Sequence, residues 1–354
     1  MGEEVLANYI CIDECEHGDV IVEDVYSERI SIPVVVCNSV VDAQILSKLN
    51  KYNIEKVKIR KSNTLATTYT EMIEEFKSIY QGLALGNKLD MEKLSKITHM
   101  ITRQSCEILR TIKSMYRVNN IDDYTYKHSI NVATYAMLLG RWLNLNESGI
   151  QNIIYAGLLH DIGKSKIPSH ILNKEGPLTS DEFKIMKEHP NLSYQICKEN
   201  THLNENITKA VLFHHEREDG SGYPFQVKGS KIDTISKIIG IADVYDALTS
   251  DRVYKTRMTP FDTFKIMLDY GYENKMDLKI LNVFLSKTAQ FYSGLCVQMC
   301  NGEQGEIVFV PPHNITYPIV KVDGKYISTA ANVDFKIHKL INQIDNTVVK
   351  TSLR

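Results

Sequence analysis

The sequence predicts a mainly α-helical protein with a small α/β unit at its N-terminus and a short β-rich appendage at its C-terminus. Three observations support this fold class. Short β-rich runs fill the first 65 residues, apolar residues then follow a helical spacing as far as residue 290, and β-rich runs return after Gly294. The chain divides into four parts, with a helical connector ahead of the main helical domain: residues 1–65, 66–117, 118–295 and 296–354.

The N-terminal unit combines strand patterns with one helical pattern. Strands are expected at residues 20–22, 32–36 and 57–59, and a helix is expected at residues 41–49. In the connector, Met72, Phe76 and Tyr80 recur at a helical spacing, and Gly86-Asn87 marks a turn between two long helices. These helices act either as a spacer within the chain or as the contact of a homodimer through residues 66–117. In the appendage, the Asp323-Gly324 turn predicts a hairpin.

Composition and charge exclude several classes of protein. Hydrophobic residues make up 43% and charged residues 24% of the chain, as in ordinary globular proteins. A formal net charge of -2 provides no basic field for polymeric nucleic acid, although a local cationic pocket could bind a small anion. The seven cysteines are scattered and odd in number, which argues against a disulfide framework and favours a reducing compartment. With neither a signal-peptide pattern nor an apolar run of about 20 residues, we expect a cytoplasmic protein without a membrane anchor.

Histidines and aspartates of the main domain stand at helix faces and helix ends. His128 lies on the apolar stripe of one helix, and His160-Asp161 closes another, where Gly163 is expected to stop the helix. His189 follows a short helix that opens with a capping-box pattern at Thr179, and the ring pair at 214 and 215 precedes a glycine-rich loop. Two carboxylates, at 243 and 246, share part of a helix face. Imidazole and carboxylate ligands suit iron or manganese, and two such ions can drive phosphoester hydrolysis.

Four segments together resemble the HD-GYP family of bacterial cyclic-dinucleotide phosphodiesterases: HDIGKSKIP at 160–168, EHP at 188–190, HHEREDGSGYP at 214–224 and IADVYDALTSDRVYK at 241–255. The resemblance covers about half of the chain, from residue 121 to residue 290. It implies an HD-type helical bundle as the catalytic domain. A lone His-Asp pair would indicate only a generic phosphohydrolase, and the second motif makes the resemblance specific.

The resemblance also implies the roles of individual residues. The family's metal ligands fall on His128, His160, Asp161, His189, His214, His215 and Asp243, with Asp161 as the bridge. Lys164 corresponds to the lysine beside the scissile phosphate, and with Asp161 it is the expected catalytic pair. The expected substrate contacts are Lys164, Gly222, Tyr223, Asp246, Arg252 and Lys255. Tyr124 stands where a subset of the family has a glutamate that binds a third metal, so a two-metal centre, with iron or manganese, is expected.

The implied activity is hydrolysis of cyclic di-GMP by a hydroxide that bridges the two metals, which would end a second-messenger signal. The product is linear pGpG, with further cleavage to GMP as an alternative end point. Two rival functions stay open at this point. One is hydrolysis of 3′,3′-cGAMP, because no residue clearly distinguishes guanine from adenine. The other is a sensor that binds cyclic di-GMP without cutting it.

Overall fold

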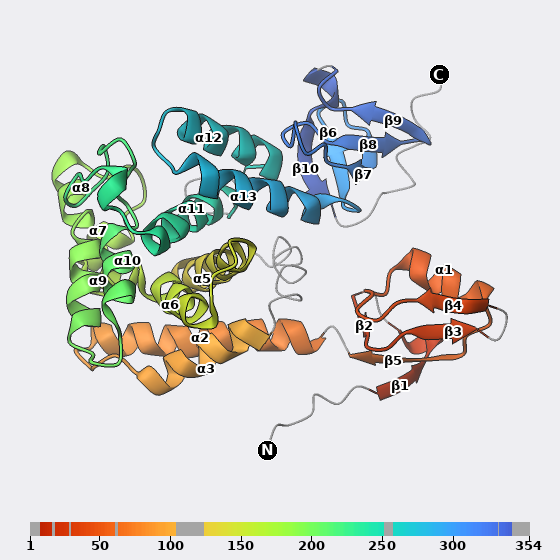
Figure 1. Ribbon diagram of the computed structural model, residues 1–354, viewed down its shortest axis with the longest axis horizontal. Coiled ribbons are helices and arrows are strands. Elements are labelled where there is room, and N and C mark those ends of the chain that lie inside the picture. The colour runs from red at the N-terminus through yellow and green to blue at the C-terminus, as the bar shows by residue number, and fades with distance from the viewer. Residues whose placement is uncertain are drawn as a thin grey trace. The chain divides into compact units, whose positions relative to one another are not determined.

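The computed structural model describes residues 8–15, 18–27, 30–60, 63–103, 124–250, 258–331 and 333–341. The chain separates into two compact units, Met1–Glu74 and Glu75–Arg354, each of which is described by itself. Figure 1 shows strands and a short helix in the first unit, and a large helical body followed by a small sheet in the second. The predicted fold class, mainly helical with small strand-containing units towards both ends, is confirmed.

The first unit packs a short helix against antiparallel strands. Helix α1 (Ala43–Lys51) begins at Asp42, whose side chain accepts a hydrogen bond from the main-chain N–H of Ile45 at 2.7 Å. One sheet has the order β1-β5-β2, and β3 pairs with β4. The strands are β1 (Asn8–Cys11), β2 (Val20–Ile21), β3 (Val25–Ser27), β4 (Ile30–Val35) and β5 (Lys56–Arg60). The core includes Ile21, Leu49 and Ile59, each at most 2% exposed.

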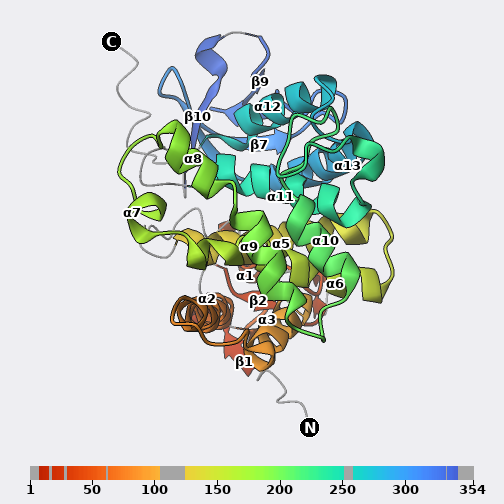
Figure 2. The ribbon, with the colours of Figure 1, turned by 90° about the vertical axis from the view of Figure 1, so that its left-hand side faces the viewer.

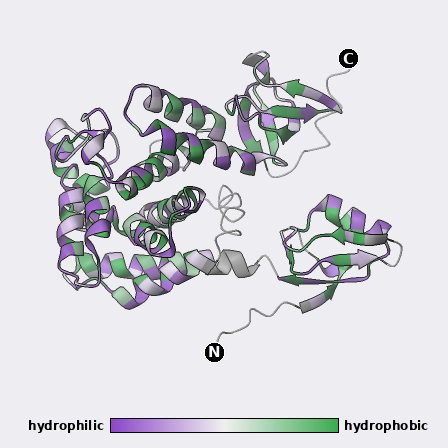
Figure 3. Ribbon diagram, in the orientation of Figure 1, coloured by the Kyte–Doolittle hydropathy of each residue, from purple (hydrophilic) through white to green (hydrophobic). Residues whose placement is uncertain are grey.

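Two helices precede the helical body of the second unit in the chain. They are α2 (Asn63–Ala84), which crosses the boundary between the units, and α3 (Met91–Arg103). The bundle consists of α5 (Tyr124–Trp142), α6 (Glu147–Leu159), α7 (Ser169–Leu172), α8 (Ser180–Met186), α9 (His189–Lys198), α10 (Glu205–Phe213), α11 (Thr234–Thr249), α12 (Pro260–Tyr272) and α13 (Leu278–Ala289). Figure 2 shows α5, α6, α9, α10 and α11 grouped together. In Figure 3, apolar and hydrophilic residues alternate along α12 and α13, as expected of helices with one buried face.

Helix α5 is the centre of the bundle, because it is buried on every side from His128 to Gly140. It lies unusually close to α6: a side chain on Gly157 would come within 2.5 Å of the Cα atom of Ala133. Tyr135 of α5 packs on the rings of Tyr245 and Phe284, at centroid distances of 4.9 and 6.2 Å. The hydroxyls of Tyr245 and Tyr292 share a 2.6 Å hydrogen bond. This close packing fixes the positions of the helix ends that carry the candidate site.

A five-stranded antiparallel sheet follows the bundle, in the order β10-β6-β7-β8-β9. Its strands are β6 (Cys296–Met299), β7 (Gln304–Phe309), β8 (Ile319–Val322), β9 (Lys325–Ser328) and β10 (Ile337–Ile341). The predicted hairpin joins β8 to β9, and both Asp323 and Gly324 have the positive φ that a type I′ turn requires. Within the described ranges, no helix combines the length and apolarity needed to cross a membrane. The cytoplasmic location stays a prediction.

Candidate metal centre

Three histidines of the bundle are oriented in the same way at the boundaries of helices. His160 and His214 are the C-caps of α6 and α10, and His189 is the first residue of α9. The Nδ1 atom of each ring lies 2.7–2.8 Å from the main-chain oxygen of the residue three positions earlier. Because a carbonyl only accepts hydrogen bonds, Nδ1 carries the proton in each ring, and the lone pair of Nε2 is available for a metal.

His128 is oriented by a carboxylate instead. Its Nδ1 atom lies 2.7 Å from Oδ2 of Asp246, whose other oxygen accepts hydrogen bonds from Asn131 and Ser250 at 2.8 and 3.0 Å. The ring of Tyr124 stacks on His128 at a centroid distance of 5.7 Å. Asp246 was expected to contact substrate, but it is buried behind His128 and only 1% exposed. In the structure Asp246 orients the ring of His128, a predicted metal ligand, and its expected contact with substrate stays a prediction.

The seven predicted metal ligands come together in two adjoining groups. Potential ligand atoms lie within 4.8 Å of one another in each group, the first being Asp161, His189, His214 and His215 and the second His128, His160 and Asp243. Asp161 belongs to the first group and also contacts the second. Its Oδ1 atom lies 3.2 Å from Nε2 of His189, and its Oδ2 atom lies 3.3 Å from Nε2 of His160 and 3.5 Å from Nε2 of His128. This arrangement suits a carboxylate that bridges two cations.

Two carboxyls and two imidazoles of the centre have pKa values that favour the charge states in which they bind metals. Burial opposes ionisation of Asp161, but Lys164 and His160 outweigh it and hold the pKa of this carboxyl well below its usual range. Burial likewise opposes ionisation of Asp243, and hydrogen bonding to His128 holds its pKa low. Burial, followed by the charge of a neighbouring histidine, lowers the pKa of both His214 and His215.

The donor set therefore fits divalent cations. Ionised carboxylates and neutral imidazoles are the forms that bind metals, and buried carboxylates need a compensating positive charge. Among the described residues, no group donates a hydrogen bond to the buried Oδ1 atom of Asp161, which leaves this oxygen for a cation. His128 differs: burial opposes its protonation, but hydrogen bonds with Asp243 and Asp246 raise its pKa to about 9. Binding of a metal at His128 would release this proton.

Lys164 is the one predicted catalytic cation that reaches this centre in the described part of the chain. It lies in the 3-10 turn η3 (Ile162–Lys166), directly after Asp161. Its Nζ atom is 2.6 Å from Oδ2 of Asp161, while 24% of its side chain remains exposed. A partly exposed ammonium group beside the bridging carboxylate can reach both the centre and an anionic ligand.

Comparison with known proteins identifies the bundle. Residues 118–280 match the HD domain family. Over 245 residues, the chain is 30% identical to the cyclic di-GMP phosphodiesterase PA4108 of Pseudomonas aeruginosa, covering 69% of this chain and 59% of that protein. The chain carries an HD domain of the HD-GYP family. An HD domain implies dependence on divalent metals, and the two groups around Asp161 are the candidate site for them.

Two further curated proteins are similar to this chain. The cyclic di-GMP phosphodiesterase PdeB of Borreliella burgdorferi is 28% identical over 239 residues, which cover 64% of this chain and 62% of PdeB. The 3′3′-cGAMP-specific phosphodiesterase 1 of Vibrio cholerae is 33% identical over 182 residues, covering 51% of this chain and 42% of that protein. The chain thus spans less than two thirds of the length of each of these curated relatives.

The Gly-Tyr-Pro loop of this HD-GYP domain packs directly on the end of α10. A side chain on Gly222 would come within 2.5 Å of the main chain of His215, Glu216 and Arg217, so only glycine fits there. Gly222 is therefore buried against the main chain, and its expected contact with substrate stays a prediction. Tyr223, by contrast, covers the ring of His215 at a centroid distance of 4.6 Å and lies beside the centre.

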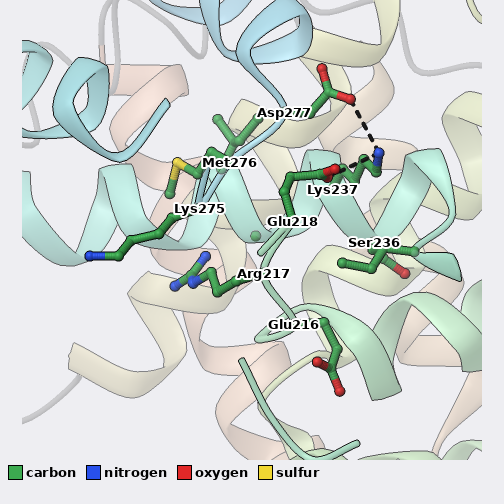
Figure 4. Close-up of a pocket in the computed structure, with 11 residues that line it drawn as sticks. Glu216, Arg217, Glu218, Ser236, Lys237, Lys275, Met276 and Asp277 are labelled. Carbon is green, nitrogen blue, oxygen red and sulfur yellow. Dashed lines mark hydrogen bonds and ion pairs between the residues drawn. The ribbon is translucent and has the colours of Figure 1, made fainter. Parts of the chain in front are cut away.

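Glu216 holds the second half of the loop, a role that the sequence analysis missed. Its buried carboxylate accepts hydrogen bonds from the main-chain N–H groups of Phe225 and Val227, at 2.6 and 3.0 Å. Figure 4 shows this carboxylate directed away from Lys237. Lys237 forms ion pairs with Glu218 at 2.9 Å and with Asp277 at 3.2 Å. The position of Glu216 directly after two predicted histidine ligands was the signal available in the sequence.

Ser193 closes the turn that carries His160 and Asp161. Its buried hydroxyl donates to the main-chain oxygen of His160 at 2.9 Å and accepts from the N–H of Gly163 at 2.8 Å. A side chain on Gly163 would lie 2.3 Å from the main-chain oxygen of His189. Gly163 was expected to stop α6, but it lies inside η3 and is needed for this close approach instead.

Two predicted substrate contacts, Arg252 and Lys255, lie outside the described residues. The other predicted site residues are described, and all seven predicted ligands belong to the two groups. None of the described cysteines takes part in either group, which agrees with the choice of histidine and aspartate as ligands.

Proposed function

We propose that the protein is a metal-dependent phosphodiesterase that hydrolyses cyclic di-GMP to linear pGpG. The observation that carries this proposal is the position of Asp161, whose two oxygens face separate groups of ligands. The names of PA4108 and PdeB support cyclic di-GMP as the substrate. Further cleavage of pGpG to GMP is the alternative end point.

We propose two divalent ions, iron or manganese, with Asp161 as their bridge. Histidine nitrogens and carboxylate oxygens suit both metals, and the described ligands include no thiolate that would favour zinc. His189, His214 and His215 would hold one ion, while His128, His160 and Asp243 would hold the other. The aromatic ring of Tyr124 offers no carboxylate for a third ion.

Bound divalent ions would supply Lewis acidity and activate water for attack on phosphorus. The protein groups hold the substrate and balance its charge. The Lys164 ammonium, 2.6 Å from Asp161, is placed to stabilise negative charge on the phosphate or on the leaving oxygen. Tyr223 presents an aromatic ring beside His215, and Arg252 and Lys255 are proposed to contact phosphate oxygens.

Product analysis of the purified, metal-loaded protein tests this proposal. Wild type should convert cyclic di-GMP to pGpG, and the His160→Ala variant should fall to the rate of chelator-treated protein, because a ligand is lost. His170→Ala is the matched control, since His170 is exposed on α7, outside both ligand groups. The proposal is wrong if metal-loaded wild type leaves cyclic di-GMP intact and behaves like His160→Ala.

Hydrolysis of 3′,3′-cGAMP is the second candidate. It is favoured by the 33% identity to the 3′3′-cGAMP-specific phosphodiesterase 1 of Vibrio cholerae. Turnover of both dinucleotides measured side by side would decide between them. Tight binding of cyclic di-GMP without turnover would instead support the sensor function that the sequence left open.

A further inference from the structure

A lysine that no motif assigned lies at the edge of the candidate centre. Lys187 caps the C-terminal end of α8, two residues before the ligand His189. Its Nζ atom lies 4.8 Å from the ring centre of Phe183 and 5.4 Å from that of Tyr223. Tyr223 also lies beside the rings of two predicted ligands, His215 at 4.6 Å and His189 at 6.3 Å. The Lys187 ammonium and a predicted metal ligand therefore contact the same aromatic ring.

Lys187 forms no ion pair with a carboxylate of the described chain. Two neighbouring lysines, Lys174 and Lys184, differ from it in this respect. Lys174 and Lys184 form ion pairs with Glu182 and Asp181 at 2.5 and 2.8 Å. Aromatic faces attract a cation without neutralising it, so Lys187 is held in place and keeps its charge for an anion. Phe183 is 47% exposed, which leaves this edge of the site open to a ligand.

A cyclic dinucleotide carries two phosphodiesters in one ring, and only one can occupy the metal centre at a time. The second phosphate must then lie near the centre but outside it. Lys164 is paired with Asp161 at the centre itself, whereas Lys187 lies over the ring of Tyr223 and pairs with no carboxylate of the described chain. We propose that Lys187, held between Phe183 and Tyr223, binds the uncut phosphate of the cyclic dinucleotide. This inference rests on the proposed function.

Kinetics on two substrates test the role of Lys187. Cyclic di-GMP has a second phosphate, whereas bis(p-nitrophenyl) phosphate has a single phosphodiester. A hydrogen-bonded ion pair contributes about 1.5–3 kcal/mol, so Lys187→Met should raise KM for cyclic di-GMP about tenfold or more. The increase in KM should exceed both the change in kcat and any change seen with bis(p-nitrophenyl) phosphate. Lys187→Arg should restore KM, because it retains the charge.

Lys198→Met is the matched control. Lys198 also lies over a tyrosine ring, that of Tyr194 at 5.4 Å, but its partner ring is not among those that contact the ligand histidines. Its kinetics should equal those of wild type. Calorimetry with a phosphorothioate analogue of cyclic di-GMP that resists cleavage should show the same loss of affinity for Lys187→Met.

The possible results separate the two proposals. If Lys187→Met equals Lys198→Met, or if it impairs both substrates to the same extent, Lys187 only caps α8 and the inference fails, while the phosphodiesterase proposal stands. If wild type cleaves bis(p-nitrophenyl) phosphate but neither cleaves nor binds a cyclic dinucleotide, the proposed substrate and the role of Lys187 fail together. A selective loss of affinity for the cyclic dinucleotide supports both.

Discussion

Replacing Ser193 by alanine should weaken the turn that carries His160 and Asp161. The Ser193 hydroxyl, which is 0% exposed, hydrogen bonds to the main-chain oxygen of His160 and to the N–H of Gly163. Loss of a partner costs each buried main-chain group about 1–3 kcal/mol, so unfolding of Ser193→Ala should require about 3 kcal/mol less than unfolding of wild type. Because the turn orients two predicted ligands, metal affinity should also fall about 10- to 100-fold.

Urea unfolding of metal-free protein would measure the first effect, and calorimetric titration with Mn²⁺ the second. Ser286→Ala is the matched control, because the Ser286 hydroxyl donates only to a main-chain oxygen of its own helix, that of Val283 at 3.2 Å. The reasoning is refuted if Ser193→Ala and Ser286→Ala lose the same stability and bind Mn²⁺ equally well.

Three further predictions concern the loop and the charges around the centre. Glu216→Gln should destabilise the protein by about 2 kcal/mol, because one N–H of the loop loses its acceptor, and hydrogen exchange should report faster exchange at Phe225. Lys237→Met should cost about 2 kcal/mol in urea unfolding, since the carboxylates of Glu218 and Asp277 lose a half-buried partner, whereas exposed Lys198→Met should change little. Metal-free protein should be most stable near neutral pH. Below about pH 6.5 stability should fall, because the lowered pKa values of His214 and His215 mean that the unfolded chain binds protons more readily. As the pH rises from about 6.5 to 9, stability should also fall. His128, with its pKa raised to about 9, keeps a proton in the folded protein that the unfolded chain has released. Thermal unfolding from pH 5 to pH 10 checks both limbs, and a flat profile would contradict them.

The predicted homodimer through residues 66–117 stays a prediction. Most of helix α2 and all of α3 lie in this range, and residues 104–117 lie outside the described part of the chain. Sedimentation of the purified protein would measure its oligomeric state directly.

Local chemistry made much of this protein readable from its sequence. The capping box at Thr179 forms as predicted and starts α8, and the Asp323-Gly324 turn joins two strands, because both depend on residues that are close neighbours in the chain. The ligand types and their places at helix ends also followed from the sequence. His160 and His214 cap helices whose apolar spacing was visible.

Only the tertiary structure decided which groups support those ligands. Asp246 orients His128 from 118 positions away, and Ser193 binds a turn that begins 33 positions earlier. The need for glycine at position 163 comes from main chain around His189 that approaches from another segment rather than from a turn. Such contacts leave no local pattern, because they depend on how the helices pack. The sequence therefore determined the chemistry of the candidate centre, and packing determined its geometry.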